Sequence, residues 1–108
     1  MENRIYQYRV WDKLQNKMDY NVVPLLGDIL SDKGNDNYIL MQFTETEDKK
    51  GRQIYEGDIC SFLDWKPKPI VWRDGRYWLG NTLVIVCKME CDQMEIIGNI
   101  FEDPKLIS

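Results

Sequence analysis

The sequence of 108 residues contains no histidine, the side chain most often used as a general acid or base near neutral pH. Triads that pair serine or cysteine with histidine are therefore excluded, and acid–base chemistry would fall to carboxylates, lysine or tyrosine. Long apolar runs are also lacking: none approaches the roughly 20 residues that span a membrane, and charges interrupt the first twenty positions. We expect neither an enzyme nor a membrane protein, and no cofactor.

Cysteine is scarce, with Cys60, Cys87 and Cys91 as the three thiols. An odd number argues against a disulfide framework and favours a reducing cytoplasm. The spacing of Cys87 and Cys91 resembles half a zinc site. With one further thiol and no histidine, a closed four-ligand site would need an acidic residue or a second chain. We favour buried or unreactive thiols.

A strong charge of one sign is lacking too, since 14 basic and 18 acidic residues give a net charge of −4. This argues against a whole surface that grips nucleic acid, and it is too weak a field for an acidic mimic of nucleic acid. What is abundant is aromatic surface, which makes up 12% of the chain and includes 4 tryptophans. The length predicts one domain over residues 1–108, with some of these rings on its surface.

Alternating apolar residues predict short β-strands, beginning with Ile5 to Trp11. That pattern places Tyr8 and Val10 on a buried face and Gln7 and Arg9 on a polar face. The turn-forming residues 12–17 then predict a hairpin to the next strand.

Further strands are expected along most of the chain, and no helix longer than a turn is required. Pro67 and Pro69 limit ladder bonding, so the strand after them is predicted to begin only at Ile70. Residues Leu25 to Asn37 are predicted to form a loop. The remaining predicted strands are Met18–Val23, Tyr38–Phe43 (buried on both faces), Ile59–Leu63, Ile70–Arg73, Arg76–Leu79, Leu83–Met89 and Met94–Phe101. Short strands at such spacings are typical of an antiparallel barrel or sandwich.

Glycines mark the expected turns. Gly51 and Gly57 lie where a left-handed backbone would reverse the chain, and the carboxylate of Asp58 is expected to bind nearby backbone amides. Asp74-Gly75 is the signal for a two-residue type I′ hairpin, and Gly98 with its neighbour Asn99 predicts a bulge. We expect the segment Thr44 to Phe62 to reverse the direction of the chain, and the rest of the fold to be organised around it.

The same segment carries several carboxylates, on Glu45, Glu47, Asp48, Glu56 and Asp58. Hard oxygen ligands of this kind suit a divalent cation. We favour the simpler interpretation that these side chains solvate turns or bond to backbone groups.

The stretch Trp65 to Trp78 combines aromatic rings with four cations and one acid, a charge of +3 against −7 for the remainder. Such a mixture suits a single-stranded nucleic-acid platform, and it also suits a protein interface, including self-association. In a purely structural interpretation Val71 and Trp78 pack in the core, with Trp72 as a further candidate, and the cations are solvated edge residues. The surface we predict for a partner consists of Trp65, Lys66, Lys68, Trp72, Arg73, Arg76, Tyr77 and Trp78.

Six motifs in this order resemble the YopX family of phage and prophage proteins. They are Tyr8-Arg-Val-Trp-Asp-Lys13, Leu40-Met-Gln-Phe-Thr44, Asp48-Lys-Lys-Gly51, Ile54-Tyr-Glu-Gly-Asp-Ile59, Val71-Trp-Arg-Asp-Gly75 and Ile97-Gly-Asn-Ile-Phe-Glu-Asp-Pro104. The resemblance extends over nearly the whole chain. Two features depart from the pattern: a glycine is usual soon after the Gln-aromatic-Thr motif, where this chain has Glu45-Thr46, and the loop Leu25 to Asn37 has no counterpart.

The resemblance implies an all-β, mainly antiparallel fold, namely a small SH3-like barrel with additional N-terminal strands and little or no helix. It also implies a phage or prophage origin and a role in the cytoplasm of the bacterial host. It carries no catalytic residues, so from resemblance and composition together we expect a non-enzymatic protein that binds an unknown host or phage protein or itself. Nucleic acid is the less favoured partner.

Overall fold

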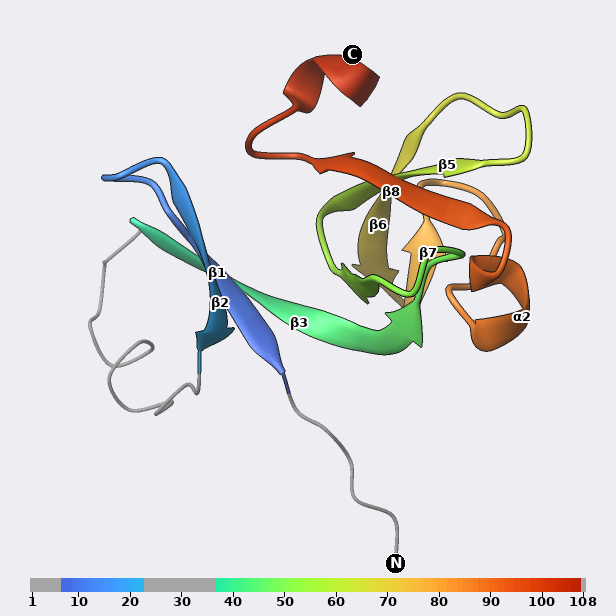
Figure 1. Cartoon of the computed structure of the whole chain (residues 1–108), viewed down its shortest axis with the longest axis horizontal. Helices are drawn as coiled ribbons and strands as arrows, with labels where there is room; N and C mark the ends of the chain where they lie inside the picture. Colours follow the sequence, from blue (N-terminus) through green and yellow to red (C-terminus); the bar gives the residue numbers. More distant parts are fainter. Residues whose placement is uncertain (1–6, 23–36, 108) are drawn as a thin grey trace, which may run out of the picture. The chain divides into compact units, whose positions relative to one another are not determined.

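The computed structural model describes residues 7–22 and 37–107. The chain divides into two compact units, Met1–Phe43 and Thr44–Ser108, which are taken in turn (Figure 1). The predictions for Ile5, for Val23 and for nearly all of the loop Leu25 to Asn37 lie outside the described residues. Among the described residues, no helix is long and apolar enough to cross a bilayer.

The first unit contains an antiparallel hairpin and the beginning of a third strand. β1 (Tyr8–Asp12) pairs with β2 (Lys17–Val22) on one side and with β3 (Tyr38–Glu47) on the other. The side chain of Asp12 closes the hairpin turn by accepting hydrogen bonds from the amides of Leu14, at 2.9 Å, and Gln15. The predicted hairpin is therefore confirmed.

The prediction that Arg9 lies on a polar face of β1 is wrong, because Arg9 is only 1% exposed. Arg9 lies opposite Tyr20 in the register of β1 and β2, and its guanidinium lies 5.8 Å from the centroid of the Tyr20 ring. It also donates to the Tyr20 hydroxyl at 3.5 Å. An aromatic ring and a hydroxyl oxygen thus take the place of water around part of this cation.

β3 continues into the second unit, where it pairs with the short β4 (Gln53–Tyr55). Thr44 fixes this pairing from its side chain, because its Oγ1 donates to the carbonyl of Ile54 at 2.8 Å. The next residue, Glu45, has a φ of 69°. This left-handed conformation favours glycine, and it occurs where the resembling family usually has one.

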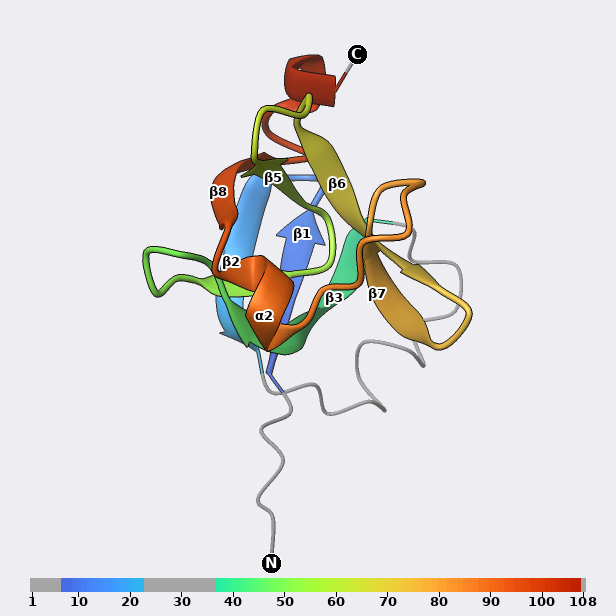
Figure 2. The same ribbon diagram turned by 90° about the vertical axis from the view of Figure 1, so that its right-hand side faces the viewer.

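The second unit is built on a four-stranded antiparallel sheet in the order β7-β6-β5-β8 (Figures 1 and 2). Its strands are β5 (Asp58–Phe62), β6 (Lys68–Arg73), β7 (Arg76–Leu79) and β8 (Met94–Asn99). The helical parts are the short α2 (Lys88–Cys91) and the 3-10 helix η1 (Pro104–Ile107). The apolar core consists of Ile54, Cys60, Phe62, Ile70, Leu79, Val86, Cys91 and Met94.

Three predictions for this unit need correction. β6 begins two residues earlier than Ile70. Pro69 lies opposite Ile59 on β5, and although it has no amide to donate, its carbonyl accepts a hydrogen bond from the amide of Gly80 at 2.7 Å. Residues 83–89 are not a strand, and only Ile85 forms an isolated bridge, to Trp78. The bulge lies at Ile97, one residue before the predicted position, where the pairing of β8 with β5 shifts register.

Gly98 has a different role from the one predicted. A Cβ atom on Gly98 would lie 2.6 Å from Oδ2 of Asp103 and 2.9 Å from its Cβ, so the position requires glycine for close approach. Asn99 then turns the chain, because its Oδ1 accepts hydrogen bonds from the amides of Phe101 and Glu102. These contacts fix the C-terminal turn that leads into η1.

The all-β, mainly antiparallel class is confirmed, with the N-terminal strands and the small helical content that were expected. The curled strands of the second unit agree with a small barrel (Figure 2). Gly51 and Gly57 reverse the chain with φ angles of 79° and 89°, as predicted.

Replacing Glu45 with glycine tests the left-handed position. We expect the free energy of unfolding to stay constant or rise by up to about 1 kcal/mol, since glycine relieves the strain of a positive φ and offsets its own entropy cost. Thermal and urea denaturation measure the change. Glu47→Gly, at another exposed position of β3, is the matched control and should lower stability by about 0.5–1 kcal/mol. Equal destabilisation by both variants would contradict this account.

Candidate interaction site

The β6–β7 hairpin extends past the sheet that supports it. β6 pairs with β5 only through Lys68 and Pro69, and the rest of its length pairs with β7 alone. Figure 2 shows the far end of the hairpin diverging from β5. Asp74 and Gly75 close the hairpin with φ angles of 53° and 77°, which confirms the predicted type I′ turn. Within the sheet, the outer half of β6 is therefore supported by β7 alone.

Trp72 and Tyr77 form a ring pair on the face of the hairpin that continues from the core. They lie opposite each other in the register, with ring centroids 4.7 Å apart and planes at 65°. Tyr77 packs against the core cluster, whereas Trp72 remains 54% exposed. Together with the exposed Arg76 they make up what we call the hairpin tip. Arg76 lies opposite Arg73 in the register, so its side chain is on the other face of the hairpin from the two rings. Trp72 is thus a surface residue held in place by a partly buried one, not a core residue.

Arg73 lies on the opposite face and is not a solvated edge residue. Its Nη1 donates to the carbonyl of Gly80 and its Nη2 to that of Thr82, both at 2.9 Å. The guanidinium also covers the ring of Trp78 at 4.7 Å, while Trp78 Nε1 donates back to the carbonyl of Arg73 at 2.8 Å. The cation therefore holds the loop after β7 to the back of the hairpin.

The lysines and Trp65 lie away from the hairpin tip. Trp65 packs edge-on against Phe62 in the loop before β6, with centroids 5.3 Å apart. From Lys68 to Trp72 the strand rises about 13 Å, so Lys68 lies well away from the exposed ring of Trp72 along β6. The stem of Lys68 lies where a side chain at Gly80 would contact it, at 3.2 Å. Lys66 is exposed.

Of the eight residues predicted for a partner surface, the structure brings the rings of Trp72 and Tyr77 together at the hairpin tip, and Arg76 lies beside the turn on the other face. Arg73 and Trp78 form a structural clamp on that other face. No pattern in the sequence indicates the clamp, because its acceptors are the backbone carbonyls of a loop.

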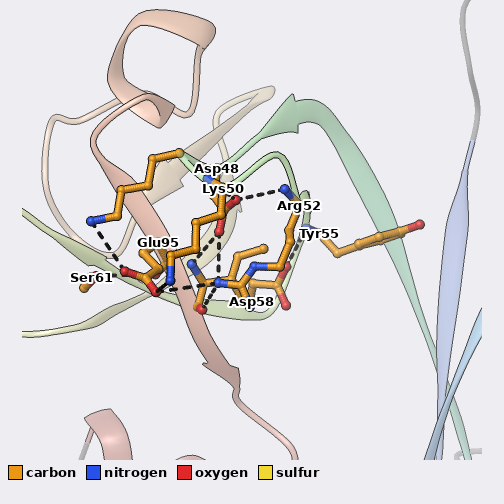
Figure 3. A network of polar contacts seen from close by, with 9 residues as sticks. Asp48, Lys50, Arg52, Tyr55, Asp58, Ser61 and Glu95 are labelled. Carbon is orange, nitrogen blue, oxygen red and sulfur yellow. Dashed lines mark hydrogen bonds and ion pairs between the residues drawn. The ribbon is translucent and has the colours of Figure 1, made fainter.

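The charge-rich segment Asp48–Arg52, which we call the corner, forms a polar network with β8 (Figure 3). Asp48 is 4% exposed. Its carboxylate accepts hydrogen bonds from the amides of Lys50 at 3.0 Å, Arg52 at 2.9 Å and Ile96 at 3.0 Å, and pairs with the Arg52 guanidinium at 3.2 Å. Burial alone would raise the pKa of Asp48, but these donors and the guanidinium lower it below its ordinary value.

Glu95 joins the network from β8. It pairs with Lys50 at 3.1 Å and with Lys49 at 3.4 Å, and the hydrogen bond from Lys50 is the main cause that lowers the pKa of Glu95. These are exposed contacts that add little stability.

Two of the carboxylates predicted as a possible cation site, those of Asp48 and Asp58, are used within the fold. Asp58 accepts a hydrogen bond from the amide of Tyr55 at 2.8 Å, as expected for the turn at Gly57. Asp48 is occupied by the donors described above. In the described ranges 7–22 and 37–107, no three acidic, cysteine or histidine side chains gather in a way that could hold a metal ion.

The three thiols are free, and Cys60 and Cys91 are buried in the core. Burial raises the pKa of both thiols, which keeps them protonated and unreactive. Cys91 is also a donor to the hydroxyl of Thr46 at 3.4 Å. Cys87 is half-buried.

The chain is similar to known proteins both in sequence family and in fold. A family model described as YopX protein matches residues 25–108. The chain belongs to the YopX family. The solved structure of protein EF1440 from Enterococcus faecalis is similar, with a TM-score of 0.79 and 25% sequence identity over 98% of this chain and 100% of that one. A search of curated proteins gave no match.

The matched residues include five of the six motifs, all except Tyr8–Lys13, and the structure explains what several of them do in this YopX-family protein. Thr44, Asp48, Asp58 and Asn99 each bind backbone groups of a turn or a neighbouring strand. These residues therefore help to specify the fold, whereas the ring of Trp72 at the hairpin tip is 54% exposed.

Acid should remove the contribution of Asp48. Because its pKa in the folded protein lies below its ordinary 3.8, the stabilisation is complete above about pH 4 and is lost as the pH falls through the lower value. Asp48→Asn should therefore lower the free energy of unfolding by about 1–3 kcal/mol at pH 7, and by less at pH 2.5. Urea denaturation at the two pH values measures this difference.

The control is Asp64→Asn, which changes an exposed carboxylate in the loop after β5. It should alter stability by less than about 0.5 kcal/mol at pH 7. A loss for Asp48→Asn that is the same at both pH values would show that the carboxylate charge is not responsible.

Proposed function

We propose that this YopX-family protein is a non-enzymatic accessory protein of a phage or prophage, a small SH3-like β module that binds a protein partner in the host cytoplasm. The hairpin tip is the binding surface. The observation that carries the proposal is Trp72, which is more than half exposed and is nevertheless fixed by its edge-on contact with Tyr77.

An exposed ring of this kind is suited to protein recognition for two reasons. Tryptophan, tyrosine and arginine are the residues that most often supply the binding energy of an interface. A ring that is already held in one orientation also loses little conformational freedom on binding, so more of its contact energy appears as affinity. Arg76 next to Tyr77 adds a cation that an acidic group on the partner can meet.

The Trp65–Trp78 segment carries a charge of +3 and the remainder of the chain −7, so the basic segment of one copy is attracted to the acidic remainder of another. A second copy of the chain is therefore one class of partner. A separate host or phage protein with an acidic and apolar contact surface is the other. Both predict that the hairpin tip is covered in the complex, and the measurement of mass below separates them.

The non-enzymatic part of the proposal is supported by how the acidic side chains are used. The buried carboxylates of Asp48 and Asp58 are engaged by backbone amides. A general acid or base needs a carboxyl group that can reach a substrate and exchange its proton near neutral pH. With no histidine in the chain, these engaged groups leave acid–base chemistry poorly provided for.

Single-stranded nucleic acid is less favoured because the guanidinium of Arg73, one of the four cations of the segment, is engaged within the protein. Arg73 is bound to the carbonyls of Gly80 and Thr82 and covers the ring of Trp78. A nucleic-acid platform needs cations that can reach the phosphates beside several stacked rings, and the Trp78 ring is covered by this cation.

Substituting Trp72 with alanine should abolish the interaction while leaving the fold intact. We expect the partner captured by the wild-type protein from phage-infected bacteria to be lost with Trp72→Ala and weakened at least about tenfold with Arg76→Ala. Self-association would appear instead as a fall in mass at equilibrium sedimentation for the same variants.

Trp65→Ala is the matched control, since it removes an exposed indole that lies outside the hairpin tip. Capture and mass should both be unchanged by it. If all three variants behave like the wild-type protein in both measurements, the hairpin tip is not the binding surface.

Oligonucleotide binding tests the alternative function directly. We expect a fluorescently labelled single-stranded oligonucleotide to show no binding at about 50 mM or 200 mM salt, since the guanidinium of Arg73 and the ring of Trp78 are engaged with each other and with the loop after β7. Binding that weakens steeply between about 50 mM and 200 mM salt, and that Trp72→Ala reduces, would favour the nucleic-acid function over the proposed one.

A further inference from the structure

The outer edge of β8 is covered by the corner. In an antiparallel strand, alternate residues direct their backbone groups to the same edge, and Met94 and Ile96 face away from β5 here. The carbonyl of Met94 accepts from the amide of Lys49 at 2.9 Å, the amide of Ile96 donates to Asp48 Oδ2 at 3.0 Å, and the carbonyl of Ile96 accepts from Arg52 Nη2 at 2.6 Å. The corner thus occupies the positions that a neighbouring strand would use (Figure 3).

The opposite edge of the sheet is covered in a different way. The amide of Leu79 donates to the carbonyl of Val84 at 2.9 Å, and the amide of Val86 donates to the carbonyl of Tyr77 at 3.0 Å. Main chain therefore covers β7. On β8, by contrast, two of the three bonds come from side chains, so substitution of those side chains leaves only the bond from the Lys49 amide to hold the corner at this edge.

We propose that the outer edge of β8 is a latent strand-pairing surface. The corner blocks this edge, and removal of the corner's hydrogen bonds lets β8 of a second copy pair there. An uncovered edge presents unpaired amides and carbonyls, which are a template for another strand. An antiparallel pair of identical strands is self-complementary about a two-fold axis, so the second copy offers the same donors and acceptors in the required order. This inference is independent of the hairpin tip.

The test uses the full chain with Asp48→Ala and Arg52→Ala combined, and Arg52→Ala alone. Lys50→Ala is the matched control, because Lys50 pairs with the Glu95 side chain and makes none of the three edge bonds. We expect the mass of the double variant to rise with concentration at equilibrium sedimentation, while Lys50→Ala keeps the wild-type mass. The amide of Ile96 should exchange at least about tenfold faster than in the wild-type protein in dilute samples, and should regain protection in concentrated ones.

Two further measurements make the result decisive. Circular dichroism shows whether the double variant is folded. If it is not, Asp48→Asn combined with Arg52→Ala is used with the same readouts, because the side-chain oxygen of asparagine can still accept from the amides of Lys50 and Arg52, whereas its NH₂ group cannot accept from the amide of Ile96. Adding Trp72→Ala distinguishes the surfaces, because association through β8 persists without the hairpin tip. A folded variant with unchanged mass overturns the proposal, as does association in which the Ile96 amide stays unprotected or which Trp72→Ala abolishes.

Discussion

The carboxylate of Asp48 is the contact on which the second unit depends. It is buried, and a buried charge is tolerated only when donors replace the water it has lost. Here the donors come from its own turn and from Ile96, a residue 48 positions further along the chain. One side chain therefore closes the turn at Gly51 and fixes that turn against β8. The bonds from the Lys49 amide to Met94 and from Arg52 to the carbonyl of Ile96 hold the turn at the same strand.

Other polar residues that carry the family resemblance act over shorter distances but in the same manner. Asp58 binds the amide of Tyr55, Asn99 binds those of the two residues that follow Ile100, and Gly98 allows Asp103 to approach. A resemblance that consists of such residues indicates that the backbone path is shared. It does not by itself indicate a shared partner, because the exposed side chains of the hairpin tip take no part in these bonds.

The sequence was sufficient where structure follows from local chemistry. The turns at Gly51, Gly57 and Asp74-Gly75 follow from residues that tolerate a positive φ, and the alternation of β1 predicted its hairpin. It was insufficient where an apolar pattern is not buried: Leu83 and Met89, which suggested a strand, are 89% and 79% exposed. The clamp at Arg73 and the cover on β8 were also missed, because both are made with backbone groups that no side-chain pattern reports.

The covered edges also limit how a partner can bind to the second unit. Strand addition uses free amides and carbonyls, and the bonds to Tyr77, Leu79, Met94 and Ile96 occupy those groups on both outer strands. Recognition while the corner is in place then depends on side chains. Beyond the sheet the hairpin has one face held by the Arg73 clamp, and its other face presents Trp72 supported by Tyr77. The same contacts that stiffen the hairpin therefore hold its most exposed ring in position. This is why a rigid surface for side-chain contact is found on the face of the hairpin and not at the backbone edge of an outer strand.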